Sequence, residues 1–291
     1  MNASTNLVCP LCGGLEFKTV GKLIDSHVLR CRICWLEVTD PFVKANYDGC
    51  DQSTSHSSTI TSPEYIEAMM SQFSALYDLI QRRAANRLQL YSELLGRKPE
   101  NILEVGSGTG WMVHAFNRLG VQSVGLESDA LLVSQAQKLG ADVRKADICQ
   151  LNPNDYSKFD VICSSQTLEH ILDPKSAIIN MKSLGRPGCV IHVDVPNSAC
   201  WGARIRRLRH GSKRWGMLEL PHHQIGYYPV SLRILFTNAG LEILRIMEKP
   251  TNDAVFGQTI LPDAVLSKIA MYLTKHLGHG YLLVGIARKP S

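Results

Sequence analysis

Short apolar runs alternate with amphipathic segments along the chain after residue 100. The apolar runs predict seven strands, at residues 101–105, 122–127, a short stretch near Val143, 159–164, 188–196, 241–248 and 281–289. The segments between them predict helices over residues 111–119 and 130–139, and helices that begin at residues 174 and 229. Strands that alternate with helices indicate an α/β fold, in which a mostly parallel sheet carries helices on both faces.

Residues at the helix ends support these boundaries. Gly120 and Gly140 follow the first two helices, where a glycine in the left-handed conformation often ends a helix. Asp173 and Pro174 provide an N-cap carboxylate and a proline for the first turn of the third helix. A further helical stretch, expected as one or two helices, covers residues 64–95.

The N-terminal third divides into parts of different composition. Residues 48–63, DGCDQSTSHSSTITSP, are rich in serine and threonine, which is typical of a linker. The cysteine-containing residues before this stretch form a separate short module. We therefore expect a small module at 1–45, a linker at 46–63 and an α/β domain at 64–291, with N-terminal helices at 64–98 and an insertion at 198–221.

Composition places the chain among ordinary globular proteins, with 45% apolar and 20% charged residues. The net charge of +5 is too small to indicate nucleic-acid binding by itself. No apolar run reaches the roughly 18 residues that a membrane-spanning helix needs. The first residues, MNASTNLVCP, lack the basic and apolar regions of a secretion signal. We therefore expect a cytoplasmic protein in a reducing compartment.

Four of the nine cysteines form two pairs, Cys9 with Cys12 and Cys31 with Cys34, and 18 residues separate the pairs. This spacing is typical of a zinc ribbon, in which each pair turns tightly and directs two thiolates at one ion. Disulfides or a redox pair are the alternatives. Reducing conditions disfavour disulfides. A redox centre would need only one of the two cysteine pairs. Because four thiolates fill a tetrahedron, the predicted Zn²⁺ is structural.

A glycine-rich turn follows the first strand of the sheet, in NILEVGSGTGWMVHAF (residues 101–116). Ligands of such sheets bind beyond the carboxyl ends of the strands, so this turn is the expected nucleotide site. The dinucleotide fingerprint G-x-G-x-x-G needs a third glycine for close packing of helix on strand. Trp111 stands at that position, after Gly106 and Gly108, so the pattern disfavours a pyrophosphate site.

The stretch ILEVGSGTGW resembles the first motif of class I S-adenosylmethionine-dependent methyltransferases. Three further stretches, VGLESD, KADICQL and SSQTLEHILDP, resemble later motifs of that family in the correct order. The resemblance implies that S-adenosylmethionine is the cofactor, that Glu127 binds its ribose hydroxyls, and that Asp147 and Ile148 lie at its adenine. The implied cofactor-binding residues are Glu104, Gly106, Ser107, Gly108, Gly110, Glu127, Asp147, Ile148 and Ser165.

Methyltransferases that begin with a four-cysteine ribbon, followed by TDP and a tyrosine-containing linker, form a recognisable subset, and EVTDPFVKANYDG is similar to it. Relatives in that subset act mainly on sugars, nucleotide-linked sugars, glycans and secondary metabolites. The resemblance therefore implies methyl transfer to oxygen or carbon of a small or glycan-type acceptor. Trp35 departs from the subset, in which a glycine usually follows the second cysteine pair.

Methyl transfer requires alignment of acceptor and methyl group, and a base where the acceptor must lose a proton. Imidazole suits that role near neutral pH. His170 follows the fourth strand, where the family's acceptor pocket begins, and His223 lies where related enzymes carry an active-site histidine. We predict both as catalytic residues; the alternative is a histidine that packs the pocket wall. Glu169 either orients a histidine or forms a cap or salt bridge, and Tyr227 and Tyr228 are candidate pocket walls.

The insertion contains a basic run, WGARIRRLRHGSKRWG. One interpretation is a solvated helix or loop. A second is that its arginines attract an anionic acceptor, because guanidinium pairs bidentately with phosphate. A third is contact with a membrane surface, since aromatic and aliphatic residues interleave with the charges. The arginines concerned are Arg204, Arg206, Arg207 and Arg209.

Two other classes of function compete with a small-molecule methyltransferase. An RNA methyltransferase with a zinc ribbon is the first, but the segment after strand four lacks the N-P-P-Y or D-P-P-Y and Pro-Cys patterns of nucleic-acid enzymes. A non-catalytic binding protein on the same fold is the second, and the intact glycines, Glu127 and Asp147 argue against it. The sequence does not indicate an oligomeric state.

Overall fold

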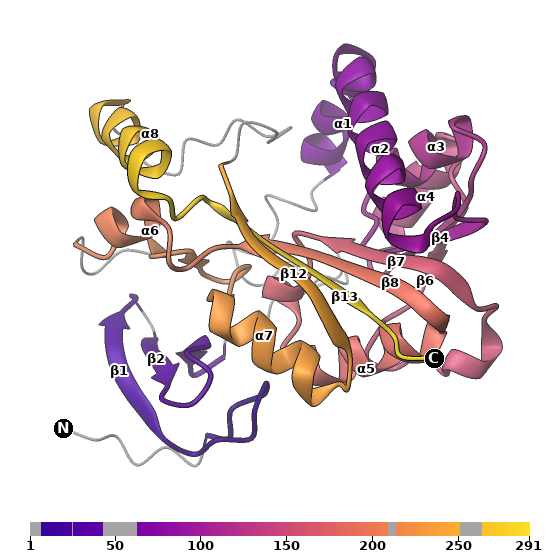
Figure 1. Cartoon of the computed structure of the whole chain (residues 1–291). Coiled ribbons are helices and arrows are strands. Elements are labelled where there is room, and N and C mark those ends of the chain that lie inside the picture. Colours follow the sequence, from indigo (N-terminus) through magenta and orange to yellow (C-terminus); the bar gives the residue numbers. More distant parts are fainter. Residues whose placement is uncertain (1–6, 25, 43–62, 209–213, 251–263) are drawn as a thin grey trace. The chain divides into compact units, whose positions relative to one another are not determined.

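The computed structural model describes residues 7–24, 26–42, 63–208, 214–250 and 264–291 (Figure 1). Most of the expected linker, and Arg209 in the insertion, lie outside the described residues. The chain divides into two compact units. The first unit contains Met1–Lys44, Gln166–Ile178 and Val193–Ala287, and the second contains Ala45–Ser165, Ile179–His192 and Arg288–Ser291.

A seven-stranded sheet has the strand order β12-β13-β8-β7-β4-β5-β6. Its strands are β4 (Asn101–Val105), β5 (Gln122–Glu127), β6 (Val143–Lys145), β7 (Phe159–Ser165), β8 (Gly185–Pro196), β12 (Glu242–Lys249) and β13 (Leu282–Arg288). Strand β4 pairs in parallel with β5 on one side and with β7 on the other, and β5 pairs in parallel with β6. The order reverses at β4, so the carboxyl ends of β4 and β7 form the switch point at which ligands of doubly wound sheets bind.

Helices separate these strands, and local signals in the sequence set their ends. The helices before and within the parallel part are α1 (Pro63–Ser71), α2 (Phe73–Leu95), α3 (Trp111–Arg118), α4 (Ala130–Lys138) and α5 (Pro174–Leu184), with a 3₁₀ turn, η1 (Pro153–Asp155). Gly120 and Gly140 have φ angles of 72° and 80°, the left-handed conformation expected after a helix. The backbone N–H of Ser176 donates to Asp173, as predicted for an N-cap. The predicted Rossmann-like α/β fold is confirmed.

Every residue of β4 is buried, including the polar Asn101 and Glu104, as expected for a central strand of a sheet that is covered on both faces. Val113 and Phe116 of α3 are also fully buried. This core fixes the end of β4, and therefore the start of the glycine-rich turn that follows it.

The first unit contains a second, smaller sheet with the order β1-β2-β3-β11. Its strands are β1 (Phe17–Lys22), β2 (His27–Cys31), β3 (Glu37–Asp40) and β11 (Ile225–Gly226), and all the pairings are antiparallel. The first three strands belong to the cysteine module, whereas β11 comes from a segment nearly 200 residues later in the chain. The module therefore shares a sheet with the residues that directly follow His223.

The first unit also contains several short helices and a hairpin. They are a 3₁₀ turn, η2 (Leu168–His170), helices α6 (Trp201–Arg206), α7 (Pro229–Asn238) and α8 (Ala264–Leu277), and a short hairpin of β9 (Arg214–Trp215) and β10 (Leu218–Glu219). Helix α6 packs against α8 through Ala203 and Ala270 (Figure 1). The sequence does not predict α8. None of the described helices combines the length and apolar character needed to cross a membrane.

Candidate functional site

The glycine-rich turn after β4 has a backbone that only glycine adopts readily. Gly106, Gly108 and Gly110 have φ angles of 70°, 55° and 73°. The N–H of Gly106 donates to the carbonyl of Leu126 at 2.8 Å, which ties the turn to β5. A Cβ atom built on Gly108 would meet no atom within 4 Å. The turn therefore presents its backbone to open space at the switch point.

Gly110 explains how a tryptophan can stand where a dinucleotide enzyme has its third glycine. A Cβ atom on Gly110 would lie 2.8 Å from Cβ of Ala141 and 2.9 Å from Cβ of Ala136. Gly110 thus provides the close packing at the start of α3, one position earlier than the dinucleotide fingerprint requires. Trp111 is then free to pack its ring, which is 8% exposed, in the core.

Glu127 ends β5 beside this turn, and backbone groups fix its carboxylate. The N–H of Gly108 donates to Oε2 at 2.9 Å, and the N–H groups of Ser128 and Asp129 donate to Oε1 at 2.8 Å and 3.0 Å. A carboxylate oxygen has two lone pairs, so Oε2 can accept a further hydrogen bond. A hydroxyl group placed beside the turn could donate to it, as the ribose of a nucleoside would.

The other predicted cofactor residues also lie in the second unit. Asp147 is exposed and accepts a hydrogen bond from the N–H of Cys149 at 2.8 Å, whereas Ile148 is buried. Ser165 accepts a hydrogen bond from Nη2 of Arg87 in α2 at 2.8 Å. Arg87 is not predicted from the sequence, because no local pattern links it to a residue 78 positions away. Glu104 and Ser107 are buried.

The open glycine turn leaves room for the part of S-adenosylmethionine that approaches the backbone. The Glu127 carboxylate can accept hydrogen bonds from its ribose, and Ile148 offers an apolar contact to its adenine. The predicted set of nine residues therefore occupies one unit and is chemically suited to that cofactor. His170 and His223 lie in the other unit, where they form a cluster of their own.

His170, His223 and Glu169 come together in the first unit. One potential ligand atom from each side chain lies within 4.8 Å of the others. The two imidazole rings have centroids 4.7 Å apart and meet at an angle of 67°. The Nδ1 atom of His170 lies 3.0 Å from the backbone carbonyl of His222, to which an Nδ1–H group can donate. The two predicted catalytic histidines are therefore neighbours.

Burial controls the charge of this cluster. It lowers the pKa of His170 to about 3, with a further contribution from His223, and it lowers the pKa of His223 to about 4. Both rings are therefore neutral at pH 7, and each keeps a nitrogen lone pair. Burial also raises the pKa of Glu169 to about 8, and the charge of Asp194 adds to this effect.

Two aromatic candidates have other partners. The hydroxyl of Tyr227 donates to the carbonyl of Leu168 at 3.2 Å and is buried. The ring of Tyr228 lies 5.9 Å from that of Trp35 in the cysteine module, and its hydroxyl joins an ion-pair network there. Tyr228 therefore connects the module to the later segment.

The four cysteines of the module converge, as the zinc ribbon prediction requires. Sγ of Cys9 lies 3.5 Å from Sγ of Cys34, and Sγ of Cys12 lies 3.6 Å from Sγ of Cys31. Disulfide sulfurs are about 2.05 Å apart, so these are not disulfides. Thiolates at about 2.3 Å from Zn²⁺ in a tetrahedron lie roughly 3.8 Å from one another, which the observed spacing fits.

The two cysteine pairs form equivalent turns. The N–H of Gly13 donates to the carbonyl of Cys9, and the N–H of Trp35 donates to the carbonyl of Cys31. Gly13 and Trp35 both have a left-handed φ, at 74° and 62°. A side chain in this conformation costs about 1 kcal/mol, which explains why glycine is usual after the second pair. The turn forms with Trp35 nonetheless.

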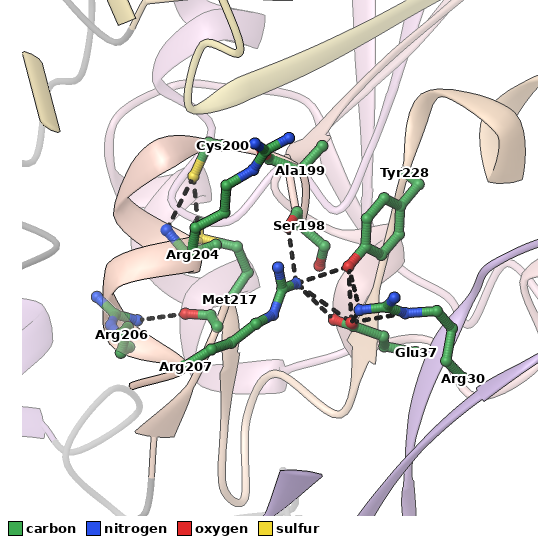
Figure 2. Close-up of polar contacts among 12 residues, drawn as sticks. Arg30, Glu37, Ser198, Ala199, Cys200, Arg204, Arg206, Arg207, Met217 and Tyr228 are labelled. Atoms are coloured by element: carbon green, nitrogen blue, oxygen red, sulfur yellow. Dashed lines mark hydrogen bonds and ion pairs between the residues drawn. The ribbon is translucent and has the colours of Figure 1, made fainter. Parts of the chain in front are cut away.

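Glu37 in β3 joins the module to the later segment (Figure 2). Its side chain is fully buried and accepts hydrogen bonds from Arg30 at 2.7 Å, from Arg207 at 3.2 Å and from the hydroxyl of Tyr228 at 2.7 Å. Burial, and then the charge of Glu37, raise the pKa of Tyr228, so its hydroxyl keeps the proton that it donates. Arg207 also donates to the carbonyl of Ser198 at 2.7 Å. The sequence does not reveal this network, because Arg207 and Tyr228 lie 170 and 191 positions from Glu37.

The Glu37→Ala variant should lower the free energy of unfolding by about 3 kcal/mol, because two guanidinium groups would lose their buried partner. Urea unfolding measures this loss. The matched control is Asp142→Ala, which removes an ion pair with Arg144 whose side chains are 49% and 54% exposed. An exposed pair contributes less than about 1 kcal/mol. Equal losses in the two variants would contradict the role of Glu37.

The basic residues of the insertion that the structure describes also bond within the protein. Nε of Arg204 donates to the carbonyl of Ala199 at 3.0 Å, and its guanidinium lies 4.7 Å from the ring centroid of Trp201. Nη1 of Arg206 donates to the carbonyl of Gly216 at 3.0 Å. Arg207 is held by Glu37. An anionic acceptor or a membrane surface at this insertion stays a prediction.

The sequence of this chain is similar to a methyltransferase family and to known O-methyltransferases. Residues 77–246, more than half of the chain, match a family described as a methyltransferase domain. A mitochondrial ubiquinone biosynthesis O-methyltransferase of Dictyostelium discoideum is 26% identical over 49% of this chain and 54% of its own length. A ubiquinone biosynthesis O-methyltransferase of Coxiella burnetii is 29% identical over 35% of this chain and 46% of its own length. The chain thus spans about half the length of the curated relatives it matches.

Solved structures show the same fold. The plantazolicin methyltransferase BamL, in complex with a triazolic desmethylPZN analog and SAH, has a TM-score of 0.55 and 14% identity over 80% of this chain and 93% of its own. An S-adenosylmethionine-dependent methyltransferase from Archaeoglobus fulgidus has a TM-score of 0.53 and 15% identity over 77% of this chain and 100% of its own. These likenesses confirm the fold of class I methyltransferases, and the family match establishes that this chain belongs to the methyltransferase-domain family.

Proposed function

We propose that the protein is an S-adenosylmethionine-dependent methyltransferase that transfers a methyl group to oxygen or carbon of a small acceptor. The glycine turn after β4, with the Glu127 carboxylate held 2.9 Å from the N–H of Gly108, is the observation that carries this proposal. The family match supports the reaction class. The expected acceptor is a sugar, nucleotide-sugar, glycan or secondary metabolite. Relatives named for ubiquinone biosynthesis and for plantazolicin are consistent with a small acceptor.

When bound, S-adenosylmethionine supplies an electrophilic methyl group on a sulfonium. The residues of this chain have to bind the cofactor, orient the acceptor and take up a proton. Glu127 would accept hydrogen bonds from the ribose hydroxyls, and Asp147 and Ile148 would contact adenine. His170 and His223 are neutral at pH 7, because burial holds their pKa values at about 3 and about 4. We infer that they contact the acceptor as ligands to it, and that they act as a base only where the bound acceptor raises these pKa values towards neutrality.

We propose further that Cys9, Cys12, Cys31 and Cys34 bind a structural Zn²⁺. The hydrogen bond between Cys9 and Cys34 lowers the pKa of Cys9 and raises that of Cys34, so the pair shares a proton that metal binding would release. The ion would hold β3, and β3 pairs with β11 two residues after His223. The ribbon would thereby fix the backbone that carries this histidine.

We also propose that the chain is divided into a zinc ribbon, a linker and a methyltransferase domain, and that the protein is cytoplasmic.

The proposal is tested by following the formation of S-adenosylhomocysteine. The purified protein is incubated with S-adenosylmethionine and with panels of sugars, nucleotide-sugars, phenolic metabolites and RNA. We expect product with a member of the small-molecule panels. Methyl transfer to RNA alone would contradict the acceptor class, and the absence of S-adenosylmethionine binding would contradict the reaction.

The His170→Ala variant should lower kcat by roughly 100-fold or more, the usual contribution of a general base or of an acceptor ligand. Its affinity for S-adenosylmethionine should not change, because the predicted cofactor residues all belong to the other compact unit. His222→Ala is the matched control, since it keeps the carbonyl that faces His170 and removes only a neighbouring imidazole. Steady-state kinetics with the acceptor identified above measure both variants. A kcat equal to that of His222→Ala would assign His170 to packing.

A further inference from the structure

Glu169 is buried in a way that a carboxylate rarely tolerates. Its side chain is 1% exposed, and neither carboxylate oxygen accepts a hydrogen bond from another of the described residues. Buried polar groups almost always have partners, and an unpaired buried carboxylate is strongly disfavoured. Asp194, a second buried acid, adds negative charge nearby instead of compensating it. A bound cation would supply the positive charge that an ionised Glu169 needs at this position.

The two histidines beside Glu169 have the orientation typical of metal ligands. Ligating histidines generally donate their other ring N–H to a backbone carbonyl or a carboxylate, which fixes the tautomer. Nδ1 of His170 lies 3.0 Å from the carbonyl of His222, so its lone pair is on Nε2. The ring of His223 forms a hydrogen bond with the backbone of Met217. In each ring one nitrogen is engaged with the backbone and the other nitrogen carries the lone pair.

The three ligand atoms already lie close together and can be reached. They lie within 4.8 Å of one another, and ligands at about 2.1 Å from a metal ion are roughly 3.3 Å apart, so small side-chain movements would complete a site. Glu169 is buried, but both histidines are partly exposed. An ion can therefore enter from the histidine side. Two imidazoles and one carboxylate suit Zn²⁺ and similar divalent ions better than Mg²⁺ or Ca²⁺, which prefer oxygen ligands alone.

We propose that Glu169, His170 and His223 bind a divalent transition-metal ion, in a site separate from the four cysteines. Three protein ligands leave at least one coordination position open, as in catalytic zinc sites. An acceptor oxygen bound at that position would become more acidic. This use of the ion rests on the proposed function, whereas metal binding itself does not. In the metal-bound protein the two histidines act as ligands.

The proposal is tested by counting metal ions per chain. The full chain is dialysed against Zn²⁺ and then against metal-free buffer. Its zinc content is measured by inductively coupled plasma mass spectrometry. We expect Glu169→Gln and His223→Gln each to hold about one ion fewer than the wild type. His222→Gln, a neighbouring histidine outside the cluster, should hold the wild-type number. Equal zinc contents in all four proteins would overturn the proposal.

Replacement of Zn²⁺ by Co²⁺ separates loss of the site from loss of folding. Cobalt bound to thiolates absorbs in the near ultraviolet by charge transfer, whereas cobalt bound to nitrogen and oxygen ligands shows only weaker visible bands. Glu169→Gln should keep the thiolate absorption and lose one equivalent of cobalt. A fall in thiolate absorption that accounts for the whole loss would place the missing ion in the ribbon and reject the cluster.

Measuring the binding of S-adenosylhomocysteine to the same samples distinguishes the proposed metal site from the proposed methyltransferase function. One extra ion in the wild type without binding of S-adenosylhomocysteine would support the metal site and contradict the methyltransferase function. Binding of S-adenosylhomocysteine with equal metal content in wild type and variants would support the methyltransferase function and contradict the metal site.

Discussion

The Gly108→Arg variant is expected to lose at least about 100-fold in affinity for S-adenosylmethionine, which corresponds to about 2.7 kcal/mol. A Cβ atom at this position meets no protein atom within 4 Å, so the new side chain would extend into the open space beside the turn. That space is where the cofactor is proposed to bind. Because the clash is with the ligand, the folded state should lose only the cost of a side chain at a φ of 55°, about 1–2 kcal/mol.

A matched control separates exclusion of the ligand from backbone strain. Gly140 has a φ of 80°, and a Cβ atom there also meets nothing within 4 Å, but this glycine follows α4 and is not one of the predicted cofactor residues. Gly140→Arg should show a similar loss of stability and bind S-adenosylmethionine like the wild type. Titration calorimetry measures both affinities. Similar affinities for the two variants would remove the glycine turn from the cofactor site.

The Cys31→Ser variant is expected to lose the zinc of the ribbon and to lower the free energy of unfolding by more than about 4 kcal/mol, as loss of a structural metal does. Cys31 is fully buried and ends β2, which pairs with β3. Without the ion, the metal-bound cysteines no longer hold β3, the strand that carries Glu37. Zinc content and thermal unfolding measure the effect.

Cys149→Ser is the control for this variant, because Cys149 is a partly exposed thiol outside the ribbon. It should keep the wild-type zinc content. A Cys31→Ser protein with undiminished zinc would contradict the ribbon assignment, whatever its stability.

Local signals in the sequence predict the parallel part of the sheet well. The predicted strands at 101–105 and 122–127 match β4 and β5, and the helices after them end within a residue of the predicted positions. Gly120 and Gly140 make this possible, because each marks a helix end through its own conformation. Helix α8 carries no comparable signal in the sequence and is missed.

The connection between the ribbon and the rest of the first unit could not be predicted. Glu37 bonds to Arg207 and Tyr228 across 170 and 191 positions, and no periodic pattern relates such distant residues. From sequence, the partners expected for Arg207 are therefore solvent, an anionic acceptor or a membrane surface. The same limit applies to Glu169, because the sequence marks it as a carboxylate near a histidine and cannot reveal that it is buried without a partner.

Trp35 shows how a departure from a family pattern can be accommodated. Trp35 stands where a glycine is usual in the subset that this chain resembles. In the structure, the residue keeps the left-handed φ of 62° that the glycine would have, and its ring packs edge-on against Tyr228 at 5.9 Å. The contact offsets part of the backbone cost, because aromatic pairs in this arrangement contribute about 1 kcal/mol.

The central claim is that the glycine turn and Glu127 bind S-adenosylmethionine. Native mass spectrometry tests it most directly, on the full chain mixed with equal concentrations of S-adenosylhomocysteine and a nicotinamide dinucleotide. We expect the mass of one S-adenosylhomocysteine per chain, and its absence in Gly108→Arg. A dinucleotide adduct in its place, or no nucleotide adduct at all, would contradict the account.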